Sequence, residues 1–169
     1  MPEPFGRSSV WLVTDQSNLS LLDEFYAAFA RLDGVAMAQC YAPGATFSDP
    51  VFVGLRGEQP GGMWWMLTSR AKDLTVDLVS RDAQENAGTA HWIAHYRFAQ
   101  TGRAIVNDVH SRFRFVDGLI TEQVDDFDFH RWSRQALGLP GLLLGWTPIL
   151  RGSVQTKARA GLDKYLAAP

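Results

Sequence analysis

The chain has 169 residues, the usual size of a single domain, and 46% of them are hydrophobic and 20% charged. Lys and Arg number 16 and Asp and Glu number 18, so the formal net charge is -2. This composition argues against a disordered chain and against a general nucleic-acid binder, which needs a basic excess to neutralise phosphates. Cys40 is the single cysteine, so no internal disulfide can form, and a cytoplasmic location is the default expectation.

The sequence predicts no targeting or membrane-spanning segment. Residues 1–13 hold two prolines and an acid beside a short apolar run, unlike a signal peptide. Residues 142–150 are apolar, but Gly145 and Pro148 interrupt a stretch that is already too short to cross a bilayer.

The first half of the chain predicts helices. Ser20 is a good N-cap for a helix over residues 20–33, where apolar side chains recur at helical spacing. A shorter helix over 35–41 and an extended segment over 45–52 follow, and Pro60 suits the first turn of a third helix.

The next part predicts an antiparallel sheet, because apolar and polar residues alternate along four segments. These segments are 74–78, 91–98, 105–115 and 119–129. A two-residue loop at 101–102 joins the middle strands, and a three-residue loop at 116–118 places Val109 opposite Asp125. A two-residue loop at the second turn would bring Glu122 onto the apolar face, so the hydrophobic pattern selects the longer loop.

This register points five polar side chains into the aromatic side of the sheet, namely Tyr96, Asn107, Ser111, Gln123 and Asp125. Because a buried polar group without a partner costs about 1–3 kcal/mol, such a group belongs either to a satisfied structural network or to a ligand site. Ser111 and Gln123 suit a network, and Asn107 suits both interpretations. Asp125 favours a functional role, because no inward Arg or Lys on these strands balances its charge.

The histidines do not predict a metal site. His91 and His95 have the spacing that binds zinc on a helix, but on a strand they lie about 13 Å apart. Their outward direction favours a polar surface or a subunit contact instead. No phosphate loop, dinucleotide fingerprint or paired-cysteine motif is present, so we expect no metal and no cofactor.

Two motifs resemble the nuclear transport factor 2-like superfamily, also called SnoaL-like or ketosteroid isomerase-like. The segment CYAPGATFSDPVFVGLRG, residues 40–57, is similar to the family's tyrosine, "A-T" strand and "Asp-Pro" signature. The segment FRFVDGLITEQVDDFD, residues 113–128, resembles the last hairpin of SnoaL-like proteins. The resemblance implies an α+β fold, in which about three N-terminal helices pack on a cone-shaped, curved antiparallel sheet, followed by a C-terminal helical extension.

The resemblance also implies the domain boundaries. It covers residues 18–132, which leaves residues 1–17 as an N-terminal arm and residues 133–169 as an extension similar to that of an uncharacterised bacterial subgroup. Residues 142–150 are too apolar to lie in water, and 153–167 predict a helix. We expect this tail to cover the mouth of the cone or a dimer edge.

The roles of the site residues follow from the same resemblance. The aspartate of the "Asp-Pro" pair is the general base of ketosteroid isomerases, and here it is Asp49. The two oxyanion-hole positions of those isomerases fall at Phe25, beside Tyr26, and at Ser111, which weighs against steroid isomerisation. Asp125 lies where cyclases and epoxide hydrolases of this fold place an acid. Epoxide hydrolysis is less expected, because the preceding strand lacks their inward Arg–Asp pair.

The function that these residues imply is cofactor-free proton transfer of the isomerase, cyclase or dehydratase type on an apolar small molecule. Asp49 and Asp125 are the expected catalytic residues. The expected substrate-binding residues are Tyr26, Trp64, Trp92, Tyr96, Asn107, Ser111, Gln123 and Phe127. A binding module of the same fold, without catalysis, remains the alternative, and a purely structural domain would have a filled cone. The outer sheet face mixes apolar and charged residues, so we expect a homodimer through it.

Overall fold

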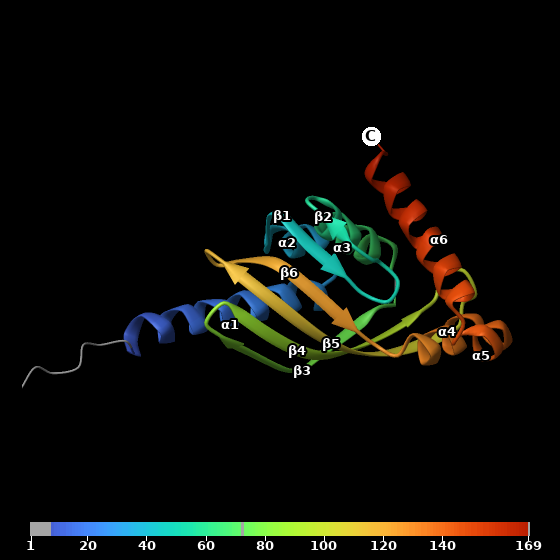
Figure 1. Ribbon diagram of the computed structural model, residues 1–169, viewed down its shortest axis with the longest axis horizontal. Coiled ribbons are helices and arrows are strands. Elements are labelled where there is room, and N and C mark those ends of the chain that lie inside the picture. Colours follow the sequence, from blue (N-terminus) through green and yellow to red (C-terminus); the bar gives the residue numbers. More distant parts are fainter. Residues whose placement is uncertain (1–7, 72, 169) are drawn as a thin grey trace, which may run out of the picture.

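The computed structural model describes residues 8–71 and 73–168, with side chains from Asp15 onward. A strongly curved sheet forms the centre, and helices cover its concave side and one end (Figure 1). The helices are α1 (Ser8–Ala30), α2 (Gly34–Gln39), α3 (Gln59–Arg70), α4 (Phe129–Leu137), α5 (Leu139–Leu144) and α6 (Pro148–Leu166). The strands are β1 (Tyr41–Ser48), β2 (Leu55–Arg56), β3 (Thr75–Gln84), β4 (Ala87–Arg97), β5 (Ala104–Val116) and β6 (Leu119–Asp126).

The six strands form one open sheet in the order β2-β1-β6-β5-β4-β3. Strands β3 to β6 are an antiparallel meander, which confirms the expected sheet. Strand β1 joins this meander parallel to β6, a pairing that the alternation pattern does not reveal. The α+β architecture with a curved sheet and helical extension is therefore the one that the sequence predicts.

The first helix is longer than expected, because Ser20 does not cap it. The Ser20 hydroxyl instead donates to the carbonyl of Gln16 within the helix, at 2.9 Å. Residues 8–17, expected to be part of an arm, are the first part of α1, and residues 1–7 lie outside the described residues. Gly34 begins α2 rather than ending α1, because the Asp33 carboxylate caps α2 at the amide of Ala36.

The hairpin between β5 and β6 differs from the expected register. Its turn has two residues, Asp117 and Gly118, both with positive φ, so the expected three-residue loop is wrong. A bulge at Thr121 then shifts the pairing by one residue and restores the inward direction of Gln123 and Asp125. Ser111, not Val109, therefore faces Asp125.

The pairing of β4 with β5 is displaced by two residues from the pairing that a two-residue loop at 101–102 requires. Tyr96 faces Ile105, and the amide of Phe98 donates to the carbonyl of Arg103, so the loop is longer than residues 101–102. A displacement by an even number of residues keeps every side chain on its face. The inward residues of these two strands are consequently those that the sequence predicts.

The C-terminal extension contacts the rest of the chain through α6. Leu162 is fully buried, Gln155 donates to the carbonyl of Pro50, and Tyr165 packs edge-on against Trp65 of α3. Within one chain, much of the segment 142–150 is not covered, and its place at a dimer edge stays a prediction. Trp146 and Ile149 are 74% and 85% exposed, because α5 and the start of α6 turn away from the sheet.

None of the helices within the described ranges is long and apolar enough to cross a membrane.

The contact between α2 and α3 depends on glycine at position 34. A Cβ at this position would lie 2.5 Å from the Cα of Trp65, so the two helix backbones pack without room for a side chain. We predict that Gly34→Ala lowers the free energy of unfolding by about 1–3 kcal/mol, the usual effect of overpacking. Urea denaturation measures this loss.

Gly152→Ala is the matched control for that substitution. Gly152 lies within α6, and an added Cβ there meets no atom within 4 Å. Because alanine favours a helix over glycine by up to about 1 kcal/mol, this variant should be unchanged or more stable. Equal stability of Gly34→Ala and the original chain would contradict the close-packing explanation.

Candidate functional site

Asp125 lies inside the cone and is only 4% exposed. The amide of Gln123 donates to its Oδ1 at 2.9 Å, because the two side chains point inward from the same strand. The carbonyl oxygen of Gln123 accepts from the hydroxyl of Tyr41 at 2.5 Å, and Trp64 Nε1 donates to that hydroxyl at 2.7 Å. A chain of hydrogen bonds therefore joins the carboxylate on β6 to the indole on α3.

Ser111 supports Asp125 from the neighbouring strand. The Ser111 hydroxyl oxygen accepts from Trp92 Nε1 at 2.8 Å and from the hydroxyl of Tyr26 at 3.2 Å. The two strands place Ser111 directly opposite Asp125, so the hydroxyl bonds to the carboxylate. Every buried polar side-chain atom in the described part of the chain has a hydrogen-bond partner. Ser111 and Gln123 thus belong to a hydrogen-bonded network, as expected, and its members include Tyr26, Tyr41 and Trp92.

Burial controls the ionisation of this network. Desolvation raises the pKa of Asp125 to about 6, although the hydrogen bonds from Ser111 and Gln123 lower it. Desolvation also raises the pKa values of Tyr26 and Tyr41 well above that of a free tyrosine, and the charge of Asp125 adds to both shifts. Both hydroxyls therefore stay protonated and act as hydrogen-bond donors at neutral pH.

Asp49 lies in the turn that follows β1. Its Oδ1 accepts from the amides of Val51 and Phe52, at 2.6 and 2.5 Å, so the carboxylate caps the turn as an Asx motif. Desolvation nevertheless raises the pKa of Asp49 to about 7, and the charge of Asp125 contributes to the rise. Burial therefore raises the pKa values of both Asp49 and Asp125 above that of a free aspartate.

The remaining predicted binding residues lie around the open end of the cone. The hydroxyl of Tyr96 accepts from Trp132 Nε1 at 2.9 Å, and burial raises the pKa of Tyr96 to about 12, with a contribution from Asp49. Phe127 is half-buried and, like Tyr96, packs against the buried cluster that contains Ile105 and Trp132. Asn107 is also half-buried, opposite Ala94 on the inner face. Trp132, on α4, belongs to this group, and the sequence reasoning missed it because it lies beyond the last expected strand.

Aromatic rings fill the interior between the hydrogen-bonded network around Asp125 and the group of residues around Tyr96. Trp64 makes edge contacts with Phe29, Phe47 and Trp92, with ring centroids 4.9, 5.6 and 6.4 Å apart. Phe25 makes edge contacts with the rings of Tyr26, Tyr41, Trp64 and Phe113. The predicted residues Tyr26, Trp64 and Trp92 therefore come together, as part of a packed aromatic layer.

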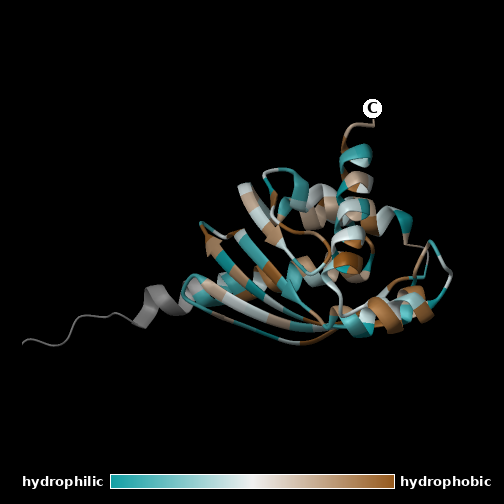
Figure 2. Cartoon of the chain, turned by 45° about the vertical axis from the view of Figure 1, so that its right-hand side comes forward, coloured by the Kyte–Doolittle hydropathy of each residue, from teal (hydrophilic) through white to brown (hydrophobic). Residues whose placement is uncertain are grey.

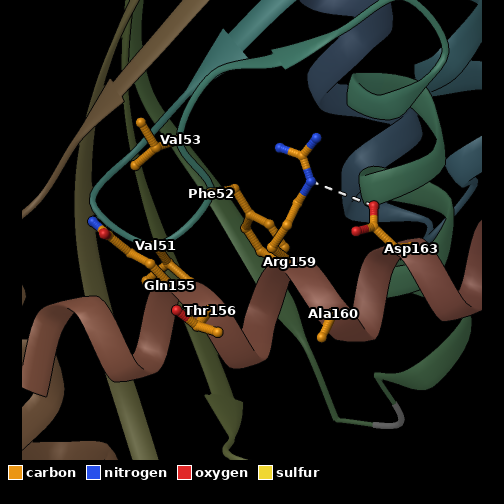
Figure 3. Close-up of a pocket in the computed structure, with 8 residues that line it drawn as sticks. All are labelled: Val51, Phe52, Val53, Gln155, Thr156, Arg159, Ala160 and Asp163. Atoms are coloured by element: carbon orange, nitrogen blue, oxygen red, sulfur yellow. Dashed lines mark hydrogen bonds and ion pairs between the residues drawn. The ribbon is translucent and has the colours of Figure 1, made fainter.

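Two pockets on the described residues lie at the edge of this layer, and Phe47 and Gln123 are among the residues that line the smaller one. The larger, of about 450 Å³, lies between α6 and the turn that contains Val51, Phe52 and Val53 (Figure 3). The side chains of Arg159 and Asp163, which are paired at 3.3 Å, form its other wall. The smaller pocket lies over β1, β2 and β6. The larger pocket is adjacent to Asp49, because Val51 and Phe52 hold that carboxylate.

A second group of ligand-type side chains lies on the outer face of the sheet. His91, Asp108 and His110 place their possible ligand atoms within 4.8 Å of one another. The sequence reasoning tested His91 against His95 on one strand and missed this group, which lies across two strands. The expected register could not reveal this group, because it places Arg112 opposite His91, whereas in the structure His91 of β4 directly faces His110 of β5.

Comparison with known proteins agrees with this geometry. Residues 22–123 match the SnoaL-like domain family. A candidate polyketide cyclase from Xanthomonas campestris is 19% identical, with a TM-score of 0.62 over 72% of this chain and 98% of that one. No curated protein sequence matches the chain.

Two further structures have the same fold. An LEH-like epoxide hydrolase from M. tuberculosis is 17% identical, with a TM-score of 0.60 over 80% of this chain and 96% of that one. A protein of ketosteroid isomerase-like fold from Catenulispora acidiphila, in complex with trimethylamine, is 16% identical, with a TM-score of 0.62 over 76% and 97%. The matched domain spans more than half of the chain, so the protein belongs to the SnoaL-like family.

Proposed function

We propose that the protein catalyses cofactor-free proton transfer on an apolar small molecule, with Asp49 as the base and Asp125 as the group that holds or returns a proton. One observation carries this proposal: two carboxylates beside an aromatic interior have pKa values near neutrality, about 7 and about 6. A general acid or base works best when its pKa lies near the working pH. Such pKa values are typical of catalytic carboxylates rather than of surface acids.

The two acids suit different roles because their surroundings differ. Asp49 lies at the mouth, in a turn adjacent to the larger pocket, where a ligand can approach it. Asp125 lies deeper, and the hydrogen bond from Gln123 holds its carboxylate in place and favours its charged form, so it can accept a proton and return it without moving. A ligand reaches Asp125 when the side chains at the mouth, including Phe127 and Tyr96, move apart. The predicted binding residues of the interior then contact the ligand.

A non-catalytic binding module is the second candidate, and the packed interior favours it. The lining of neither pocket includes Trp64, Trp92 or Asp125, so any ligand must displace ordered side chains before it meets both acids. In this alternative the same polar groups orient the ligand without transferring a proton.

Epoxide hydrolysis remains less favoured than proton transfer. The inner face of β5 presents Asn107, Val109 and Ser111, with no Arg–Asp pair beside Asp125. The likeness to an epoxide hydrolase is at 17% identity and concerns the fold.

Hydrogen exchange into apolar ketones tests the proposal even when the product of the reaction is unidentified. The protein is incubated in deuterated water with a panel of cyclic and aromatic ketones, and mass spectrometry measures deuterium beside the carbonyl. Asp49→Asn and Asp125→Asn should each slow exchange by about 10²–10⁴-fold, the usual contribution of a general base or acid. The rate of the original chain should rise with pH through about 7, because Asp49 must lose its proton to act as a base.

Asp126→Asn is the matched control, because Asp126 adjoins Asp125 but is exposed on the outer face of β6. This variant should exchange at the original rate. Native mass spectrometry of the purified chain distinguishes a proton-transfer enzyme from a non-catalytic binding module. A bound apolar molecule together with no exchange of any ketone would contradict catalysis and support the binding module.

We further propose a cytoplasmic homodimer that forms through the outer face of the sheet. Ile93 of β4 and Val106 of β5 lie on this face among charged side chains, and Val106 is 37% exposed. Light scattering at micromolar concentration should give twice the chain mass of 18.8 kDa. Ile93→Lys should reduce it to one chain, because a buried unpaired charge opposes association. A monomeric original chain would contradict the proposal.

A further inference from the structure

We propose that His91, Asp108 and His110 form a site for a divalent transition metal on the outer face of the sheet. His91 of β4 and His110 of β5 face each other directly across the ladder. Asp108 precedes His110 by two residues, so its side chain leaves the same face of β5. The sheet therefore gathers two imidazoles and one carboxylate at neighbouring positions.

The distances agree with a shared ion. Oδ1 of Asp108 lies 2.7 Å from Nε2 of His91 and 3.8 Å from Nε2 of His110. Ligands that surround zinc tetrahedrally at about 2.0–2.2 Å lie about 3.4 Å from one another, which is between these two values. The imidazoles are stacked with centroids 4.3 Å apart, and the possible ligand atoms of all three side chains lie within 4.8 Å of one another.

The ligand chemistry defines the class of metal. Two neutral imidazoles and a carboxylate suit Zn²⁺, Ni²⁺ or Cu²⁺ better than Ca²⁺ or Mg²⁺, which take oxygen ligands. The side chains of His91 and His110 are 27% and 70% exposed in the single chain, so water, or a side chain of the second copy in the proposed dimer, can complete the coordination.

Titration calorimetry with Zn²⁺ tests this site on the full chain. One ion should bind per chain, and His91→Ala and His110→Ala should each weaken binding at least about tenfold. His95→Ala is the control, because His95 lies on the same face of β4 outside the group and should bind zinc like the original chain. Circular dichroism verifies that each variant is folded.

A second measurement uses the stability of the protein. Zinc that binds the folded chain should raise its melting temperature, and both His91→Ala and His110→Ala should abolish the rise. Absence of binding, or binding by these two variants as tight as that of the original chain, would overturn the proposal. The proposed dimer uses the same face of the sheet. Light scattering therefore measures the mass of the protein in solution with and without zinc.

An independent observation concerns the surface formed by α5 and the start of α6, which we call the tail patch. Its large apolar side chains are 43% to 85% exposed, and Figure 2 shows the brown ribbon of α5 at the end of the molecule away from α1. The patch consists of Leu139, Leu142, Leu143, Leu144, Trp146 and Ile149. Single exposed apolar residues are ordinary, but a contiguous group marks a surface that contacts something apolar.

The charge around the tail patch identifies the partner. Residues 129–162 contain five of the 16 Lys and Arg residues and none of the 18 Asp and Glu residues. Arg131 and Arg134 are exposed on α4 before the patch, and Arg151 is exposed on α6 after it. A basic rim around exposed Leu, Ile and Trp complements an anionic lipid surface, where each basic residue contributes about 1 kcal/mol. The same rim repels a second copy placed symmetrically on this patch.

We infer that the tail patch inserts shallowly into the surface of anionic membranes. Trp146 suits the level of the lipid headgroups, because its ring is amphipathic and 74% exposed. The patch is far too short to span a bilayer, so the attachment is peripheral and reversible.

Sedimentation with lipid vesicles tests this inference. The full chain should bind vesicles of phosphatidylcholine mixed with phosphatidylserine and bind pure phosphatidylcholine less. The double variant Trp146→Ser, Ile149→Ser should bind at least about tenfold more weakly, because it removes apolar area from the interface. The matched control is Val79→Ser, Val116→Ser, which changes residues 54% and 56% exposed on the sheet and should bind normally.

Two results would overturn the inference. One is the absence of binding to both kinds of vesicle. The other is a loss of mass in light scattering, without lipid, for the Trp146→Ser, Ile149→Ser variant, because this would show that a second copy covers the patch. Retained mass together with weakened vesicle binding supports the lipid surface.

Discussion

A carboxylate buried in an aromatic interior is the constraint on which this structure depends. Asp125 cannot reach bulk water, so its lone pairs must be satisfied by side chains that come from other elements. Gln123 and Ser111 meet it directly, and Tyr41 and Trp64 complete the chain of hydrogen bonds. One acid thereby fixes the relative positions of β5, β6, β1 and α3. The removal of any member leaves a buried polar group without a partner, so the network specifies one arrangement.

The same burial gives the two acids of the site pKa values that suit acid–base chemistry. Desolvation raises the pKa values of both acids toward neutrality, and the charge of Asp125 also disfavours the ionisation of Asp49. Asp49 differs because the backbone of its own turn holds it, which leaves it close to the surface while Asp125 remains inside. A fold that presents one accessible and one sheltered acid can separate the removal of a proton from its storage. Proton transfer uses this division, and ligand binding alone does not require it.

The sequence predicted most of the fold and the inward direction of the site residues, because both depend on the alternation of apolar and polar side chains. Pro60 and the four alternating segments correctly indicated the third helix and the meander, whereas the extended segment predicted over 45–52 ends at Ser48, where a turn begins. Details that depend on contacts between distant segments were missed. The parallel pairing of β1 with β6 and the role of Trp132 leave no periodic signal in the chain. The group formed by His91 and His110 required a register between two strands, which spacing along one strand cannot provide.

Because of the bulge at Thr121, the number of residues in the turn of the last hairpin and the number in strand β6 can change only together. The two-residue turn alone would direct Glu122 inward, and the extra residue at the bulge returns the strand to the frame in which Gln123 and Asp125 face the core. Loss of one residue at the bulge would therefore turn the inward side chains of β6 outward and its outward side chains inward. A simultaneous gain of one residue in the turn would restore them. Related chains can thus differ in turn length at this hairpin while keeping the same acid inside, provided that the two changes arise together.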